Sequence, residues 1–208
     1  RDFGGCAGNI AYALKLLGGD PRPMAMLGSD GADYLQRLRT LGIATDIIAL
    51  LDDVYTAQAM IMTDRDNNQI TAFHPGAMMQ AHRNRIARNA EWSIGIVAPD
   101  GREAMIEHAA QMVQAGIPFV FDPGQGLPMF DGVDLRRFIG QASWVAVNDY
   151  EGRMLCERTG WNKEAISQQV KGLVVTLGAQ GCEVWEEGRC TLVPPVKPDA
   201  VLDPTGCG

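Results

Sequence analysis

The last residues of the chain hold the pattern best suited to chemistry on a phosphate group. Residues 203–208 read DPTGCG, so the three small residues Gly206, Cys207 and Gly208 follow a proline turn. Small residues let several backbone N–H groups point at one bound group, and such a nest of donors binds anions, phosphate above all. The alternative is an ordinary turn near a chain end. The pattern predicts an anion hole at these three residues.

Three further polar clusters follow apolar segments that are expected to be strands. The first runs from Asp122 to Gly126, the second begins at Asn148 and includes Glu151, and the third runs from Gly178 to Gly181. In an open parallel sheet, ligands bind outside the carboxyl ends of the strands. Each cluster alone is also consistent with a helix cap or a turn. Together they predict a polar, anion-binding cleft, although none has the spacing of a Walker A loop or a G-x-G-x-x-G fingerprint.

The rest of the chain alternates between short apolar strands and amphipathic helices, which is typical of an α/β fold. Strands are expected at 23–27, 94–98, 118–121, 144–147 and 173–177. Helices are expected at 7–17, from after Gly31 to about 41, and at 102–115, 135–140, 149–159 and 163–170. A connection begins at Gly42, and a hairpin is expected near the end at 183–193. We predict a single domain over residues 1–208, with a Rossmann-like, mostly parallel sheet flanked by helices.

A different pattern occupies residues 55–76. Two apolar segments, 58–63 and 69–73, flank the polar sequence DRDNN, which predicts a β-hairpin. A hairpin inserted into an alternating α/β chain is a candidate lid over a site. The alternative is an edge hairpin that extends the main sheet.

Composition narrows the function classes. The chain has 208 residues and a formal net charge of −7, which argues against nucleic acid as a partner because polyanion binding needs a basic surface. The five cysteines form no C-x-x-C pair, so neither a disulfide framework nor a zinc site is supported. They suggest free thiols and a cytoplasmic location. No apolar run is long enough to span a bilayer, so no membrane partner is expected.

Four motifs, taken in order, resemble the ribokinase-like (PfkB) kinases. The sequence GGCAGN at 4–9 resembles the amino-terminal signature of the family, and DPTGCG at 203–208 resembles its carboxy-terminal signature. Between them, Asn148-x-x-Glu151 is similar to the family's N-x-x-E element, and Thr176-x-Gly178-x-x-Gly181 is similar to its nucleotide-site strand and turn. The motifs extend over nearly the whole chain.

The resemblance implies transfer of the ATP γ-phosphate to a sugar hydroxyl on a ribokinase-like fold with a small β lid. Gly4, Gly5 and Asn9 match positions that hold the hydroxyls of the substrate. The cofactors implied are ATP, near Asn148, Thr176, Gly178 and Gly181, and Mg²⁺, organised by Asn148 and Glu151 through water. Gly206, Cys207 and Gly208 match the anion hole that stabilises the phosphoryl group in transfer.

Within the family, the sequences ITAFHPGAM at 70–78 and FDPGQ at 121–125 resemble the bacterial adenosine kinase-like branch. The resemblance implies that Gln125 lies on the substrate side, where an amide can bind a purine edge. Phe73 could stack on the base, with packing of the lid as its alternative role. The expected partner is therefore a small-molecule nucleoside, most simply adenosine, which becomes AMP.

Two other functions stay open on the sequence. One is a sugar or sugar-phosphate kinase of the same family, and the other is a non-catalytic ligand-binding relative. A homodimer is also left open. The family's catalytic Asp follows the glycine that matches Gly208, so the sequence is expected to be a fragment lacking both ends and inactive by itself.

Overall fold

The structure is a computed structural model that describes residues 2–65, 69–89 and 91–197. The chain divides into two compact units, residues 1–85 and 86–208, and each is described by itself. In the part of the chain that the structure describes, no helix has the length and apolar character needed to cross a membrane.

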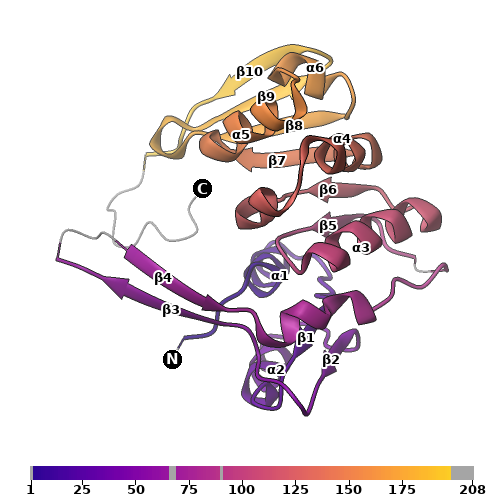
Figure 1. The fold of residues 1–208 in the computed structure, drawn as a ribbon, viewed down its shortest axis with the longest axis vertical. Coiled ribbons are helices and arrows are strands. Elements are labelled where there is room, and N and C mark those ends of the chain that lie inside the picture. Colours follow the sequence, from indigo (N-terminus) through magenta and orange to yellow (C-terminus); the bar gives the residue numbers. More distant parts are fainter. Residues whose placement is uncertain (1, 66–68, 90, 198–208) are drawn as a thin grey trace. The chain divides into compact units, whose positions relative to one another are not determined.

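The first unit contains two helices, two pairs of strands and a 3₁₀ segment (Figure 1). In chain order they are α1 (Cys6–Leu16), β1 (Ala25–Leu27), α2 (Ala32–Thr40), β2 (Ile48–Leu50), β3 (Gln58–Thr63), β4 (Gln69–His74) and η1 (Gly76–Arg83). A small core forms where Ala11 of α1 meets Leu38 of α2 and Ile43. β1 and β2 pair in parallel, with Ala25 opposite Ile48.

β3 and β4 form the expected hairpin. They pair antiparallel from Gln58 opposite His74 to Thr63 opposite Gln69, and they form a two-stranded sheet of their own. Figure 1 shows the hairpin extending as an arm beyond β1, β2 and η1. Every residue of both strands is exposed. The hairpin is therefore held at its base, by residues of the first unit.

The second unit is built on a six-stranded sheet. In chain order its elements are β5 (Gly95–Val97), α3 (Arg102–Ala115), β6 (Phe119–Phe121), η2 (Gly124–Met129), α4 (Gly132–Gln141), β7 (Trp144–Asn148), α5 (Asp149–Thr159), α6 (Lys163–Ser167), β8 (Gly172–Thr176), η3 (Gly178–Gln180), β9 (Cys182–Glu186) and β10 (Arg189–Val193). The strand order is β10-β9-β8-β7-β6-β5. β5 to β8 are parallel, and β9 and β10 add an antiparallel edge.

The order of the strands determines which face of the sheet the helices of this unit cover. Each parallel crossover moves one strand along the sheet in the same direction, so right-handed connections bring α3, α4 and α5 to one face, as Figure 1 shows. Apolar residues of the strands pack under them. Phe121 of β6 is fully buried and stacks on Phe138 of α4, with ring centroids 4.4 Å apart. This packing fixes the sheet whose carboxyl ends were expected to form the site.

The elements that differ from the sequence expectation include β2, α4 and α6. The connection after Gly42 contains β2, whose three residues are too few to give a strand pattern. α4 begins at Gly132 rather than near 135, because the Asp131 carboxylate accepts the N–H groups of Val133 and Asp134 at 2.8 Å each. α6 ends at Ser167 rather than near 170. There the Ser167 hydroxyl accepts the N–H of Gly188, which joins the helix end to the β9–β10 hairpin.

Candidate functional site

The loop before α1 carries three of the predicted substrate residues. Gly5 is the N-cap of α1 and has a φ of 99°, a left-handed conformation that favours glycine. Gly4 precedes it, and the N–H of Asn9 donates to the Gly5 carbonyl at 3.0 Å. The Asn9 residue is exposed and is not the helix cap. Its amide can therefore serve a ligand beside the glycine loop.

Tyr34 of α2 supports this loop. Its hydroxyl donates to the Gly4 carbonyl at 2.9 Å, and a Cβ atom at Gly8 would lie only 1.9 Å from the same hydroxyl. Burial raises the pKa of Tyr34, and the charge of Arg37 acts in the opposite direction. The tyrosine therefore stays a neutral donor to the loop. Sequence reasoning missed this contact, because no spacing rule connects position 34 with position 4.

Phe73 lies near the base of the β3–β4 hairpin, opposite Ala59. Because side chains alternate along a strand, Phe73 shares one face of the hairpin with Ala59 and Ile61. Phe73 is 53% exposed. Its cross-strand partner Ala59 is small, so this exposed ring is a candidate for stacking on a ligand.

In the second unit, the carboxyl ends of β6, β7 and β8 bring predicted residues together. Asn148, the last residue of β7, is the register partner of Thr176, the last residue of β8. Asp122 follows β6 directly, and its carboxyl is close enough to Glu151 to feel its charge. The nucleotide and metal residues predicted from separate motifs thus occupy one edge of one sheet.

Asn148 and Glu151 form a reciprocal capping box at the start of α5. The Asn148 side chain accepts the Glu151 N–H at 2.8 Å, and the Glu151 carboxylate accepts the Asn148 N–H at 2.9 Å. The helix-cap role considered for these residues is therefore present. It also aims the amino end of α5, with its positive dipole, at the same edge of the sheet.

Two carboxyl groups that follow strands of this sheet have raised pKa values. Burial, together with the charge of Glu151, raises the pKa of Asp122 to about 6, although the hydrogen bond from the Gly124 N–H acts in the opposite direction. Burial likewise raises the pKa of Asp100, which lies just after β5, to about 6, against the N–H of Gly101. Sequence reasoning placed Asp122 in a polar cluster but gave it no role. Its only sequence signal was its position at a strand end.

Gln125 is exposed in η2, directly after Gly124. Arg158 at the end of α5 holds this segment, since one guanidinium nitrogen donates to the carbonyls of Leu127, Pro128 and Phe130 at 3.2, 3.0 and 2.6 Å. The segment that carries Gln125 is therefore fixed from a neighbouring helix. Gln125 itself reaches solvent.

The turn after β8 requires its two glycines. Gly178 and Gly181 have φ values of 55° and 91°, and a Cβ atom at Gly181 would lie 2.1 Å from the Val193 carbonyl. The turn closes by hydrogen bonds from Leu177 N–H to Gly181 O at 2.8 Å and from Gly181 N–H to Gly178 O at 3.1 Å. The result is a tight turn with little side-chain bulk at the end of β8.

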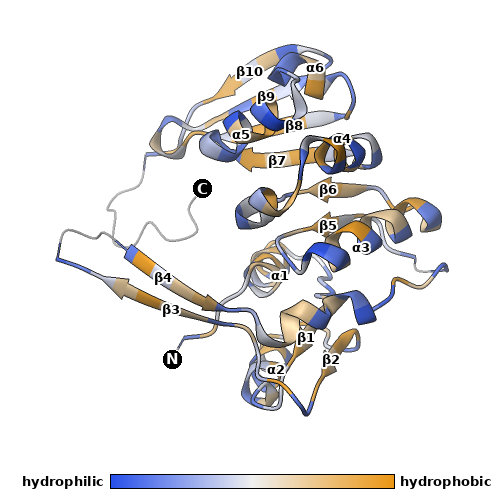
Figure 2. Cartoon of the chain, in the orientation of Figure 1, coloured by the Kyte–Doolittle hydropathy of each residue, from blue (hydrophilic) through white to orange (hydrophobic). Residues whose placement is uncertain are grey.

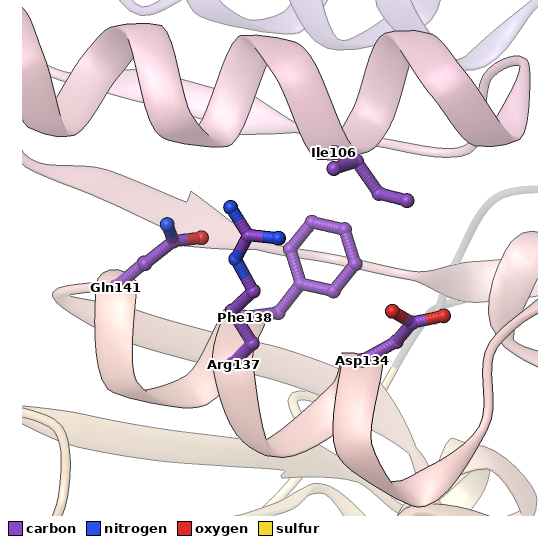
Figure 3. Close-up of a pocket in the computed structure, with 5 residues that line it drawn as sticks. All are labelled: Ile106, Asp134, Arg137, Phe138 and Gln141. Carbon is purple, nitrogen blue, oxygen red and sulfur yellow. The ribbon is translucent and has the colours of Figure 1, made fainter.

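Other parts of the predicted site are not found in the described structure. Gly206, Cys207 and Gly208 lie outside the described residues. Within the described ranges, no three His, Cys, Asp or Glu side chains gather to hold a metal ion. A shallow depression between α3 and α4 is lined by Ile106, Asp134, Arg137, Phe138 and Gln141 (Figure 3). None of these five residues belongs to the predicted site, and Phe138 is part of the core.

Comparison with known proteins identifies the family and the fold of the chain. The pfkB family of carbohydrate kinases matches the chain over residues 1–208. The chain belongs to this family. Its ribokinase-like α/β fold, with a mostly parallel sheet, agrees with the fold predicted from the sequence.

Individual relatives include kinases of nucleosides and of sugars. The chain is 52% identical to a solved Burkholderia thailandensis nucleoside kinase in complex with inosine, with a TM-score of 0.94, covering 100% of this chain and 68% of that one. It is 28% identical to a nucleoside kinase of Methanocaldococcus jannaschii, over 99% of this chain and 68% of the relative. It is 27% identical to a probable fructokinase-4 of Arabidopsis thaliana, over 99% and 69%. The chain thus spans about two thirds of the length of these relatives.

Proposed function

We propose that the protein transfers the γ-phosphate of ATP to a hydroxyl of a nucleoside, with adenosine and inosine as the first substrates to test. The observation that carries the proposal is the 52% identity, across the whole chain, with a nucleoside kinase solved with inosine. The exposed Phe73 ring on a projecting hairpin supports it, because a base offers an aromatic face for stacking and a free sugar does not.

In this proposal the first unit supplies the substrate contacts. Gly4 and Gly5 allow a ribose to approach the backbone, and the Asn9 amide can both donate to and accept from a diol. Phe73 stacks on the base, and the β3–β4 hairpin acts as the lid. Tyr34 holds the glycine loop in place through the Gly4 carbonyl.

The second unit supplies the phosphate contacts. Thr176, Gly178 and Gly181 border the nucleotide at the end of β8, and Asn148 lies beside Thr176 in the register of the sheet. Gln125 contacts the purine edge. Gly206, Cys207 and Gly208 form the anion hole, a role that rests on the sequence alone.

Mg²⁺ fits the chemistry of this edge. Asp122 and Glu151 are close enough to repel each other, and a cation near them would relieve that repulsion. Because the described residues offer few ligands, the ion would be held by Asn148 and Glu151 through water and by the phosphates, as suits a cation that dehydrates reluctantly. When bound, Mg²⁺ neutralises charge on the phosphates.

Substrate competition tests the proposal directly. The purified full-length protein would be incubated with ATP and Mg²⁺ and with adenosine, inosine, ribose or fructose, and the phosphorylated product would be identified by chromatography and ³¹P NMR. We expect kcat/KM for the nucleosides to exceed that for the free sugars by roughly a hundredfold or more, since base stacking and base hydrogen bonds act only on nucleosides. Phosphorylation of fructose or ribose in preference to both nucleosides would overturn the nucleoside assignment.

A second candidate function is that of a sugar kinase, and the similarity to a probable fructokinase supports it. A sugar kinase would gain nothing from Phe73, because a free sugar has no base to stack. Replacing Phe73 with Ala in the same competition assay therefore distinguishes the two candidates. Unchanged use of free sugars, as the preferred substrates, would favour the sugar kinase, whereas an equal loss on every substrate would show only that Phe73 packs the lid.

A further inference from the structure

The base of the β3–β4 hairpin is held by the loop between β1 and α2. The Gly28 N–H donates to the Thr56 hydroxyl at 2.9 Å, and the Ser29 N–H donates to the Val54 carbonyl at 2.9 Å. On the other side of the hairpin, the Ala77 N–H donates to the Tyr55 carbonyl at 2.8 Å. The segment 54–56 is thus hydrogen-bonded from two directions just before β3 begins.

Two glycines make this contact as close as backbone atoms allow. A Cβ atom at Gly28 would lie 2.3 Å from the Tyr55 carbonyl carbon, and a Cβ atom at Gly76 would lie 2.1 Å from the Tyr55 carbonyl oxygen. Gly76 also has a φ of 48°, in the left-handed region. The Tyr55 peptide is therefore enclosed by two segments that have no room for a side chain. Such a close contact fixes the position of the Tyr55 peptide at the base of the hairpin.

Asp30 adds a side-chain contact to the segment that leads into the hairpin. Its Oδ1 accepts the Thr56 N–H at 2.8 Å, and its Oδ2 accepts the Gln58 side-chain amide at 3.1 Å. Asp30 precedes α2, whose N-cap residue is Gly31. The Asp30 carboxylate thus contacts the hairpin segment at two successive points, Thr56 and Gln58.

The residue that Asp30 contacts in β3, Gln58, lies one pair away from Phe73 in the register of the hairpin. Gln58 pairs with His74, and the next pair along is Ala59 with Phe73. Because side chains alternate, Gln58 lies on one face of the hairpin and Phe73 on the other. Beyond this point every residue of β3 and β4 is exposed, so the direction of the arm is set at its base.

We propose that Asp30 is a positioning residue that fixes the tilt of the β3–β4 hairpin and so places Phe73 on the base of the substrate. The proposal rests on the proposed nucleoside kinase function for the part that concerns Phe73. The part that concerns the hairpin stands on the contacts alone. No role of this kind follows from the motifs of the sequence, because Asp30 reads there as a turn residue before a helix.

The main test compares Asp30→Ala with Asp33→Ala in the full-length protein. Asp33 is an exposed carboxylate in the first turn of α2, so its removal takes the same charge from the same helix start without touching the hairpin. Asp30→Ala should raise KM for adenosine about tenfold, the loss expected when charged hydrogen bonds are removed, while KM for ATP changes less than about twofold. Asp33→Ala should leave both unchanged.

A double-mutant cycle between Asp30 and Phe73 distinguishes a positioning role from a merely structural one. In a Phe73→Ala background, Asp30→Ala should raise KM for adenosine by less than about twofold, since the ring that it positions is gone. A structural role predicts the same tenfold loss in both backgrounds, and that result would overturn the proposal. Gln58→Ala removes one of the two contacts and should give an intermediate effect, which keeps the test decisive if Asp30→Ala folds poorly.

Hydrogen exchange tests the hairpin itself. In Asp30→Ala the amides of β3 and β4 should exchange about tenfold faster than in the unmodified protein, with the sheet of the second unit unaffected. Unchanged exchange in the hairpin would overturn the proposal even if nucleosides are substrates. Faster exchange in a protein that phosphorylates only free sugars would support the grip and refute the proposed function, so the two failures are distinguishable.

Discussion

The β3–β4 hairpin and the central strands of the second unit contain similar apolar residues in opposite surroundings. Met62 and Ile70 of the hairpin are 64% and 69% exposed, whereas Val145 of β7 and Val175 of β8 are fully buried. Figure 2 shows apolar colour on both the arm and the sheet. Hydrophobic side chains in the sheet stabilise the fold, while those on the hairpin leave apolar surface uncovered. The exposed hairpin side chains are therefore expected to contribute little to the stability of the fold.

The largest expected effect comes from comparing the removal of a buried apolar side chain in the sheet with the removal of an exposed one in the hairpin. Phe121→Ala should lower the free energy of unfolding by about 3–5 kcal/mol, because Phe121 is fully buried and stacked on Phe138. Met62→Ala should lower it by less than about 1 kcal/mol. Urea unfolding of both variants measures the contrast. Similar losses in the two would show that the hairpin belongs to the folding core.

The next largest effect concerns substrate rather than stability. Phe73→Ala should lower kcat/KM for adenosine by roughly 10- to 100-fold, the range expected for a lost base-stacking contact of about 1–3 kcal/mol. Its melting temperature should barely move, since the ring is more than half exposed. Ile70→Ala, on the opposite face of the hairpin, is the matched control and should keep normal kinetics. Equal kinetic losses in both variants would assign the ring to packing of the arm.

A smaller effect is expected at the phosphate edge of the second unit. Glu151→Gln preserves a side-chain acceptor for the Asn148 N–H and so keeps the capping box, but it removes the charge. We expect the Mg²⁺ concentration for half-maximal rate to rise roughly tenfold, with KM for adenosine nearly unchanged. Glu157→Gln, an exposed residue of the same helix, is the control. Superimposable Mg²⁺ titrations for the unmodified and Glu151→Gln proteins would leave Glu151 with the capping role alone.

The smallest effect is a pH dependence of stability. The folded protein holds the Asp122 proton with a pKa of about 6, against an ordinary value of 3.8, so this residue favours the folded state below pH 4 and loses that contribution as pH rises to about 6. Because the carboxyl is only half-buried, we expect the loss to be about 1 kcal/mol. The stability of the unmodified protein minus that of Asp122→Asn should fall by this amount between pH 4 and pH 7.

Urea unfolding at several pH values measures that difference. Asp33→Asn, which changes an exposed carboxyl, is measured in parallel as the control. A difference for Asp122→Asn that does not change with pH would show that the Asp122 carboxyl titrates normally in the folded protein.

Several features of the molecule were predictable because local rules govern them. α3 and α5 have the bounds expected from their hydrophobic pattern, and the strands that precede the polar clusters were placed within one or two residues. The parallel order of β5 to β8 then brings Asn148 and Thr176 side by side, as the rule for strand ends predicts. The family resemblance, which rests on four short motifs, was confirmed by the comparison with known proteins.

Other features depend on contacts between distant positions, which no local pattern records. The strand β2 exists because β1 lies beside it, and α4 begins early because Asp131 meets two free helix N–H groups. The Asp122 pKa depends on burial and on a neighbour 29 positions away. Composition and spacing therefore predicted the class of fold and the edge of the sheet at which the candidate phosphate residues lie. The support of the glycine loop by Tyr34, and the grip of Asp30 on the hairpin, were decided by tertiary structure, because each joins segments more than 25 residues apart through a single hydrogen-bonding side chain.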